Sequence, residues 1–265
     1  FSGAGCQDVG QQHTSFQRLL EDDTYDFFVS PANYSERELG NADTYMGFED
    51  TVQAYGKMAV IEEDHRTVLV MHYANTSWDA ANDIGVGGTH TMEDTLDQMK
   101  KNVADSIVSG NGMWFFDMKG GWFDDDQFYG FSRECAAEYL FSQYVDKELD
   151  SSSVAYFVDD ELTPYFTEEY SSLYFPSNII TYAGFRLQRR ELNRIGQSYD
   201  VYSMASLADG KAKAHKINIV FCAYQITDKE REAIDKYLKK NGQIVVFVYA
   251  TGLSDGKTDS AANME

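Results

Sequence analysis

Residues 56–66 read Gly56-Lys57-Met58-Ala59-Val60-Ile61-Glu62-Glu63-Asp64-His65-Arg66, so that a short apolar run meets three carboxylates and an arginine. A run of this length with turn and charge signals at both ends predicts a buried strand. Because side chains alternate along a strand, Glu62 and Glu63 are expected to point to opposite faces of the sheet. A carboxylate that ends a buried parallel strand is where barrel enzymes keep a nucleophile or base. The alternative is a salt-bridged strand end, in which Arg66 neutralises Asp64.

A second signal of the same kind lies at residues 110–123. The apolar run Met113–Phe116 ends at Asp117, and Trp114 and Trp122 flank that carboxylate. Aromatic faces stack on the C–H surface of sugar rings, and a neighbouring carboxylate can hold sugar hydroxyls. The alternative is that both tryptophans are core aromatics, which is the commoner fate of a single tryptophan. Two tryptophans around an aspartate at a strand end favour a sugar site.

The segment between these two strands predicts a helix from Thr91 to about Ser109. Thr91 and Asp94 have the spacing of a helix-capping pair, and apolar residues recur after them at helical spacing. Strand, helix and strand in this order make a βαβ unit. An earlier unit of the same kind is expected from a helix over Gln12–Leu20, a strand over Tyr25–Pro31 and a helix over Met46–Tyr55.

The residues in Asp26–Tyr34, Gly56–Thr67 and Gly112–Trp122, taken in order, resemble the second half of the barrel of clan-A glycoside hydrolases, specifically the family 42 β-galactosidases and their relatives. The resemblance implies a partial (β/α)8 TIM-type barrel, about strands 5 to 8, whose seventh strand ends in a glutamate nucleophile. It also implies a carbohydrate substrate and neither a cofactor nor a metal ion. On this match Glu62 is the nucleophile with Glu63 as the less favoured neighbour, Asp64 and Arg66 form a supporting network, and Tyr34, Trp114, Asp117 and Trp122 line the sugar site.

The remainder of the chain predicts an open, flavodoxin-like parallel α/β sheet. Residues 192–202 are similar to a typical run of the trimerisation domain that follows the barrel in family 42, which implies a homo-oligomer, either dimer or trimer. Nucleotide binding is disfavoured because the chain has neither Gly-x-Gly-x-x-Gly after its strand at 153–159 nor a phosphate-binding Gly-x-x-x-x-Gly-Lys. The expected strands are 153–159, 199–203, 216–222 and 243–249, and the expected helices are 176–195 and 227–240.

The expected domains are residues 1–150, the C-terminal half of a catalytic barrel, and residues 151–265, the trimerisation-like domain. A complete barrel of this type needs about 250 residues. The chain begins at a position that corresponds to the end of the fifth strand, so the acid/base glutamate of the fourth strand has no counterpart here. We therefore expect a fragment of a longer product, or a half-barrel completed by an upstream segment or by a separate chain.

Composition excludes several other classes of function. The chain has 43 acidic and 22 basic side chains, a formal net charge of −21, which argues against nucleic acid or anionic membranes as partners. No apolar run reaches the length of a membrane span, so we expect a soluble protein, either cytoplasmic or secreted. The cysteines Cys6, Cys135 and Cys222 lack metal-binding or disulfide spacing.

These observations lead to one main hypothesis and two alternatives. The main hypothesis is a retaining β-glycoside hydrolase that acts on a β-linked galactoside or a similar sugar. The first alternative is a non-catalytic carbohydrate-binding or assembly protein derived from such an enzyme, which the missing acid/base favours if the chain is complete. The second is an α/β protein that binds another small molecule.

Overall fold

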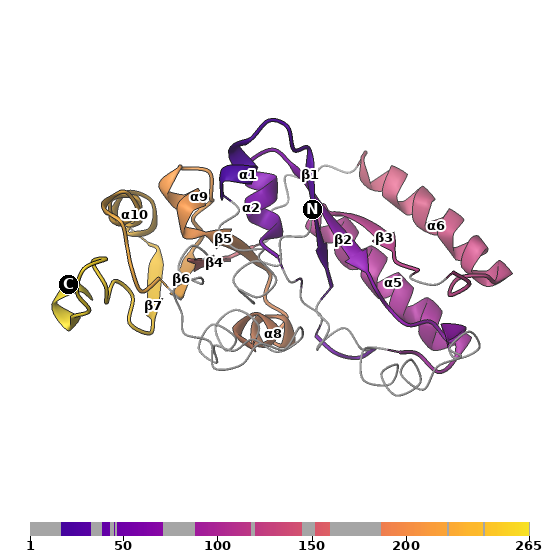
Figure 1. Cartoon of the computed structure of the whole chain (residues 1–265). Helices are drawn as coiled ribbons and strands as arrows, with labels where there is room; N and C mark the ends of the chain where they lie inside the picture. Colours follow the sequence, from indigo (N-terminus) through magenta and orange to yellow (C-terminus); the bar gives the residue numbers. More distant parts are fainter. Residues whose placement is uncertain are drawn as a thin grey trace. The chain divides into compact units, whose positions relative to one another are not determined.

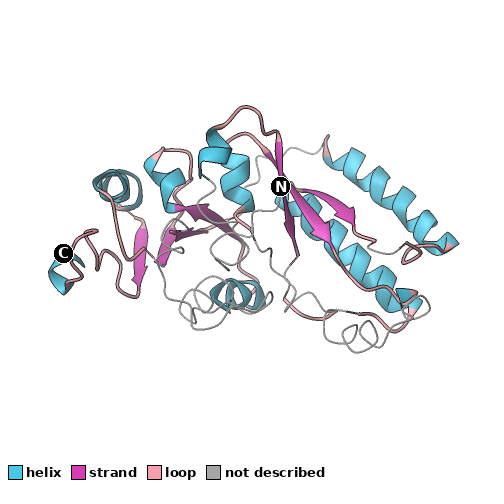
Figure 2. Cartoon of the chain, viewed as in Figure 1, coloured by secondary structure: helices cyan, strands magenta, loops and turns pink. Residues whose placement is uncertain are grey.

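The computed structural model contains two parallel β-sheets, and helices alternate with their strands along the chain (Figure 1; Figure 2). The chain is therefore of the α/β class that its sequence predicts. The structure describes residues 17–32, 39–42, 45, 47–70, 88–117, 120–144, 152–159, 187–221, 223–240 and 242–264. The chain divides into two compact units, one of residues 1–30, 46–59 and 151–265 and the other of residues 31–45 and 60–150. The expected junction of two independently folding domains near residue 150 stays a prediction.

The first sheet has three strands in the order β1-β2-β3. They are β1 (Phe27–Pro31), β2 (Met58–Glu63) and β3 (Gly112–Phe115), close to the strands expected from the apolar runs. β2 and β3 are parallel, and their register places Glu62 opposite Trp114. Two short helices, α1 (Gln17–Glu21) and α2 (Glu49–Ala54), occupy part of the segments for which longer helices were expected.

Helices α5 (Met92–Ser109) and α6 (Asp126–Ser142) pack with β3 around a hydrophobic core. The Thr91 side chain accepts a hydrogen bond from the Asp94 backbone N–H at 3.0 Å, which confirms the predicted start of α5. Met113 and Phe115 of β3 pack against this core, so their face of the strand is the covered one. The core residues are Met99, Val103, Phe128, Phe131 and Cys135.

The second sheet is parallel and has the strand order β5-β4-β6-β7. Its central strand, β4 (Val154–Val158), is buried along its whole length because apolar clusters cover both of its faces. The first two connections run to opposite sides of β4, as in doubly wound sheets. The other strands are β5 (Tyr199–Ser203), β6 (Ile217–Phe221) and β7 (Ile244–Val248), as the sequence predicts.

Besides α1 and α2, the unit that contains this sheet has four helical segments within the described residues. The predicted helix at 227–240 begins as α10 (Asp228–Ala233), with a capping box between Thr227 and Glu230, and continues as a π-helix, η4 (Ile234–Leu238). The helix predicted at 176–195 is described from residue 187 onward and includes α8 (Gln188–Arg194). The remaining two are α9 (Met204–Ala208) and η5 (Ala261–Met264).

Side chains of α2 bind the backbone of β5, which is one of the two outer strands of the second sheet. Asp50 Oδ2 accepts the N–H of Val201 at 2.7 Å, and Thr51 Oγ1 accepts the N–H of Ser203 at 2.9 Å. The same hydroxyl donates to the carbonyl oxygen of Val201 at 3.3 Å. Burial, together with the charge of Asp200, raises the pKa of Asp50 to about 7. A helix therefore supplies hydrogen bonds that an adjacent strand would otherwise make.

Candidate functional site

The two glutamates at the end of β2 lie in different environments. Burial alternates along the strand, and Glu63 is buried like Ile61, whereas Glu62 is half-buried like Val60. Side chains two residues apart share a face of a strand, so Glu63 faces the same side as Ile61 and Glu62 faces the other. Of the two carboxylates, Glu62 is the one that a ligand can approach.

Trp114 lies beside Glu62 on the neighbouring strand. The two residues are partners in the parallel register of β2 and β3, so their side chains share one face of the sheet. The Trp114 side chain is 42 % exposed, and its ring makes an edge-to-face contact with Phe116 at a centroid distance of 5.4 Å. Both residues stand at or next to the carboxyl ends of their strands, where parallel α/β proteins place their ligands.

Trp122, the other tryptophan that was expected to line a sugar site, is only 4 % exposed. The guanidinium carbon of Arg66 lies 4.8 Å from the centroid of its ring, and Thr67 Oγ1 donates a hydrogen bond to its backbone carbonyl. Arg66 also forms an ion pair with Asp64. These contacts join the segment after β2 to the segment after β3, and they leave Trp114 as the accessible indole of the pair.

Asp117 holds the turn that follows β3. Its Oδ1 accepts the N–H of Gly120 at 2.7 Å and its Oδ2 accepts the N–H of Trp122 at 3.0 Å. Gly120 and Gly121 both have positive φ, of 79° and 87°, so the turn uses the backbone freedom of glycine. Both carboxylate oxygens of Asp117 are thus engaged with the backbone. Tyr34, the fourth residue expected at a sugar site, lies outside the described residues.

A buried polar cluster lies on the Glu63 face of β2. His65 Nδ1 lies 3.1 Å from Glu63 Oε2, and Gln98 Nε2 lies 3.2 Å from His65 Nε2 and 2.9 Å from Asn102 Oδ1. Asn102 Nδ2 is 3.0 Å from His65 Nδ1. Gln98 Nε2 donates a hydrogen bond to Asn102 Oδ1, and the amide of Gln98 or of Asn102 donates to whichever ring nitrogen of His65 carries no proton. All four side chains are buried.

Tyr45 contributes a phenol to the same buried region. Burial raises the pKa of Tyr45 well above its usual value, and the charge of Asp105 and a hydrogen bond to Asp105 raise it further. The charge of Glu63 acts in the same direction. The phenol therefore keeps its proton at all physiological pH values.

Sequence reasoning singled out Glu63 but missed its partner His65, and it missed Gln98 and Asn102, which contact His65. The available signal was in α5, where Gln98 and Asn102 are four residues apart and therefore lie on one face of the helix. They adjoin the apolar positions Met99 and Val103, so the predicted apolar face of this helix has a polar border. Through Gln98 and Asn102, this polar part of α5 contacts His65, which follows the end of β2.

No protein-family model and no curated protein matches this chain.

The chemistry of the site must therefore be derived from its own residues. Within the described ranges, no group of three or more His, Cys, Asp or Glu side chains is arranged to hold a metal ion. None of the helices in these ranges is long and apolar enough to cross a membrane. Cys135 is a buried free thiol, whereas Cys6 and Cys222 fall outside the described part of the chain. The candidate site described above consists of a carboxylate, Glu62, next to an exposed indole, Trp114, at the end of a parallel sheet.

Proposed function

We propose that this chain carries the nucleophile and part of the sugar platform of a retaining β-glycoside hydrolase that acts on a galactoside-like substrate. The observation that supports this proposal is the pairing of Glu62 with the exposed Trp114 on adjacent parallel strands. A sugar ring stacked on Trp114 would lie next to the Glu62 carboxylate. In this proposal β1, β2 and β3 belong to an incomplete TIM-type barrel.

The reaction proceeds in two steps, and each step replaces one bond to the anomeric carbon with another. A Glu62 oxygen attacks the anomeric carbon, the bond to the leaving oxygen breaks, and a carboxylic acid protonates that oxygen. Water then attacks the covalent glycosyl–enzyme intermediate, gives its proton to the same carboxyl group and releases Glu62. The second carboxyl group must stand about 5–5.5 Å from the nucleophile. We propose that an upstream segment or a separate chain supplies it.

Glu62 is a better nucleophile than Glu63 for a structural reason. Glu63 is 2 % exposed and lies 3.1 Å from His65, within a cluster that ties β2 to α5. Movement of the Glu63 side chain toward a substrate would leave the buried polar groups of this cluster without partners, which is costly in a protein interior. We assign Glu63, Asp64 and Arg66 to positioning of the strand end that carries Glu62.

Covalent trapping tests the nucleophile without the missing acid. A 2,4-dinitrophenyl 2-deoxy-2-fluoro-β-galactoside has a leaving group that departs as a phenolate, so it needs no protonation. The fluorine slows hydrolysis of the intermediate because it destabilises the cationic transition state. Intact-mass analysis is expected to show addition of one fluorosugar, and peptide mapping is expected to locate it on Glu62.

The controls separate Glu62 from other carboxylates. Glu62→Gln is expected to abolish labelling, while Glu93→Gln, a change at an exposed glutamate in the first turn of α5, is expected to leave it unchanged. Labelling of Glu63 would overturn the assignment of the nucleophile. Sugar binding without any labelling would favour the alternative of a non-catalytic carbohydrate-binding protein.

We further propose that the second sheet mediates self-association into a homo-oligomer. The outer strand β7 exposes Ile244 at 53 % and Val246 at 40 %, both on one face of the strand. An exposed edge strand with apolar side chains is a ready template for pairing with another chain. Sedimentation of the purified chain would reveal whether it is a monomer, dimer or trimer.

A further inference from the structure

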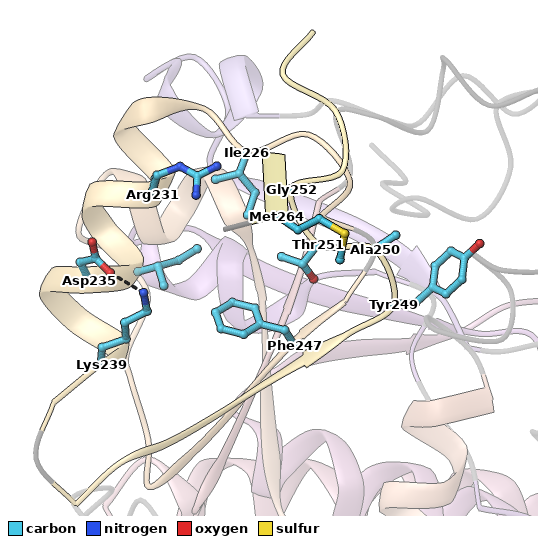
Figure 3. A pocket seen from close by; sticks show the side chains of 11 residues that line it. Ile226, Arg231, Asp235, Lys239, Phe247, Tyr249, Ala250, Thr251, Gly252 and Met264 are labelled. Atoms are coloured by element: carbon cyan, nitrogen blue, oxygen red, sulfur yellow. Dashed lines mark ion pairs between the residues drawn. The ribbon is translucent and has the colours of Figure 1, made fainter. Parts of the chain in front are cut away.

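A cavity of about 280 Å3 lies in the unit that contains the second sheet, and none of the residues of the proposed glycosidase site line it (Figure 3). One wall is formed by α10 and η4, another by β7 and the residues that follow it, and Met264 of η5 contributes to the rim. The volume is just below the roughly 300–1,000 Å3 of typical small-molecule sites, so it suits a compact ligand.

The charged side chains of the cavity come from one helical segment. Arg231, Asp235 and Lys239 are spaced four residues apart and line the same wall (Figure 3). Lys239 forms an ion pair with Asp235 at 2.7 Å, which neutralises both charges. Arg231 forms no ion pair within the described residues, and its Nη2 donates only a long hydrogen bond, 3.4 Å, to the Asn263 carbonyl oxygen. The cavity therefore has an uncompensated guanidinium at its edge.

The apolar part of the cavity is suited to a flat ring. Ile226, Ile234 and Met264 line it, and Phe247 and Tyr249 add aromatic side chains that are 46 % and 60 % exposed. Small-molecule sites combine such apolar and aromatic walls with a few polar groups that orient the ligand. A guanidinium binds carboxylates through paired hydrogen bonds, which sets the orientation of an anionic ligand.

The backbone next to the cavity is held in unusual conformations. Tyr249 and Ala250 have φ values of 53° and 48°, and they are the only non-glycine residues with positive φ in the described part of the chain. Residues held in this sparsely populated region cluster at ligand sites. The adjoining wall includes η4, a π-helix, and π-helical turns are rare and frequent at functional sites.

A fourth observation concerns Thr251, which also lines the cavity. Its side chain is nearly fully buried, at 9 % exposure, and its Oγ1 has no hydrogen-bond partner among the residues that the structure describes. An unpartnered buried hydroxyl is uncommon and calls for an explanation, such as a water molecule or a ligand that completes its hydrogen bonding.

We propose that this cavity binds a small carboxylic acid with a planar ring, whose carboxylate pairs with Arg231 and whose ring packs against Phe247. The cation, the aromatic walls, the strained Tyr249–Ala250 backbone and the unpartnered Thr251 hydroxyl all converge on one cavity. The inference is independent of the glycosidase proposal, because no residue is shared between the two sites.

Binding of benzoate tests this inference, with benzamide as an uncharged probe of the same shape. A ligand-observed NMR titration of the full chain is expected to show saturable binding of benzoate and at least tenfold weaker binding of benzamide. Arg231→Gln is expected to weaken benzoate binding about tenfold or more, because it removes a charge-assisted hydrogen-bond donor. Lys236 lies in η4, which continues α10, but it does not line the cavity. Lys236→Gln also removes one cation and is expected to leave benzoate binding unchanged.

A second variant distinguishes ligand recognition from a structural role. Thr251→Val keeps the shape of the side chain but removes the hydroxyl, so it is expected to weaken benzoate binding several-fold without lowering the melting temperature. Equal binding of benzoate and benzamide, or benzoate binding that is insensitive to Arg231→Gln, would overturn the proposal. Failure of benzoate to bind, or binding of galactose in its place, would overturn it as well.

Discussion

Glu62 and Trp114 are neighbours in the parallel register of β2 and β3, and their side chains lie side by side on one face of the sheet. Met113 and Phe115 project from the opposite face. The neighbouring pair in the same register, Glu63 and Phe115, projects to the helix-covered side. One step along the two strands therefore separates an approachable carboxylate–indole pair from a pair that belongs to the interior. Because Trp114 belongs to the approachable pair and Trp122 is buried, the two tryptophans should contribute differently to sugar binding and to stability.

Trp114→Ala and Trp122→Ala are expected to have different consequences. Trp114 is 42 % exposed, so its removal should change stability by less than about 1 kcal/mol and weaken sugar binding about tenfold. Trp122 is buried under Arg66, so its removal should reduce the free energy of unfolding by about 3–5 kcal/mol. Urea unfolding and sugar titrations measure both quantities. Equal loss of stability in the two variants would contradict the assigned roles.

Removal of the His65 side chain is expected to destabilise the protein. His65→Leu takes away the partner of Glu63 at 3.1 Å and also a hydrogen-bond partner of Gln98. A buried polar group that loses its hydrogen-bond partner costs about 1–3 kcal/mol. His90→Leu, at an exposed histidine, serves as the control and should change the free energy of unfolding by less than about 0.5 kcal/mol. Similar urea midpoints for the two variants would argue against a stabilising Glu63–His65 pair.

Asp50 should make stability depend on pH. Burial and the charge of Asp200 raise its pKa to about 7 in the folded state, whereas an unfolded aspartate titrates near about 4. The folded state therefore binds the extra proton between these values, and the free energy of unfolding falls as pH rises from about 4 to about 7. Asp50→Asn can still accept the Val201 N–H but does not titrate. Above pH 7 it should be more stable than the parent chain, on the order of 1–4 kcal/mol.

The control for this prediction is Asp23→Asn, at an exposed aspartate. Urea unfolding of the parent chain and both variants at pH 4 and at pH 8 gives the comparison. The Asp50→Asn variant should gain stability relative to the parent only at pH 8, while Asp23→Asn should match the parent at both values. A gain of the same size at pH 4 would show that ionisation of Asp50 is not the cause.

Val246→Glu is expected to reduce self-association. Val246 is 40 % exposed on the outer strand β7, so a charge there should oppose burial of the strand against a second copy. Sedimentation velocity over a range of concentrations should show a shift toward the monomer. Lys257→Glu, a charge change in the exposed turn at residues 255–258, is the matched control. Unchanged association of the Val246 variant would exclude β7 as the contact.

Much of the fold is predictable from the sequence because its signals are local. The strands around Met58–Ile61 and Val154–Val158 follow from short apolar runs, and the start of α5 follows from Thr91 and Asp94. The capping pair acts over three residues and the runs over four or five, so neither depends on the rest of the chain. The π-helical continuation of α10 was not predicted, since residues 234–238 keep the amphipathic pattern of an ordinary helix.

The site was less predictable because it depends on contacts between distant residues. The sequence treats Trp114 and Trp122 alike, and only the packing of Arg66 over one of them distinguishes the accessible ring from the buried one. The carboxylate of Asp117 is a group that could bind sugar hydroxyls, yet its oxygens accept hydrogen bonds from the backbone of its own turn. The partners of His65 in α5 are more than 30 residues away along the chain.

The hydrogen bonds from Asp50 and Thr51 to β5 also limit how copies of this chain can join. They occupy the β5 edge of the second sheet, so a strand added to this sheet would pair with its other described outer strand, β7. Two copies that met through β7 would use the same strand in each and leave no second edge of this sheet, among the described residues, for a third. Such pairing would stop at a closed twofold assembly, and a helix would thereby protect the protein from open-ended fibre growth.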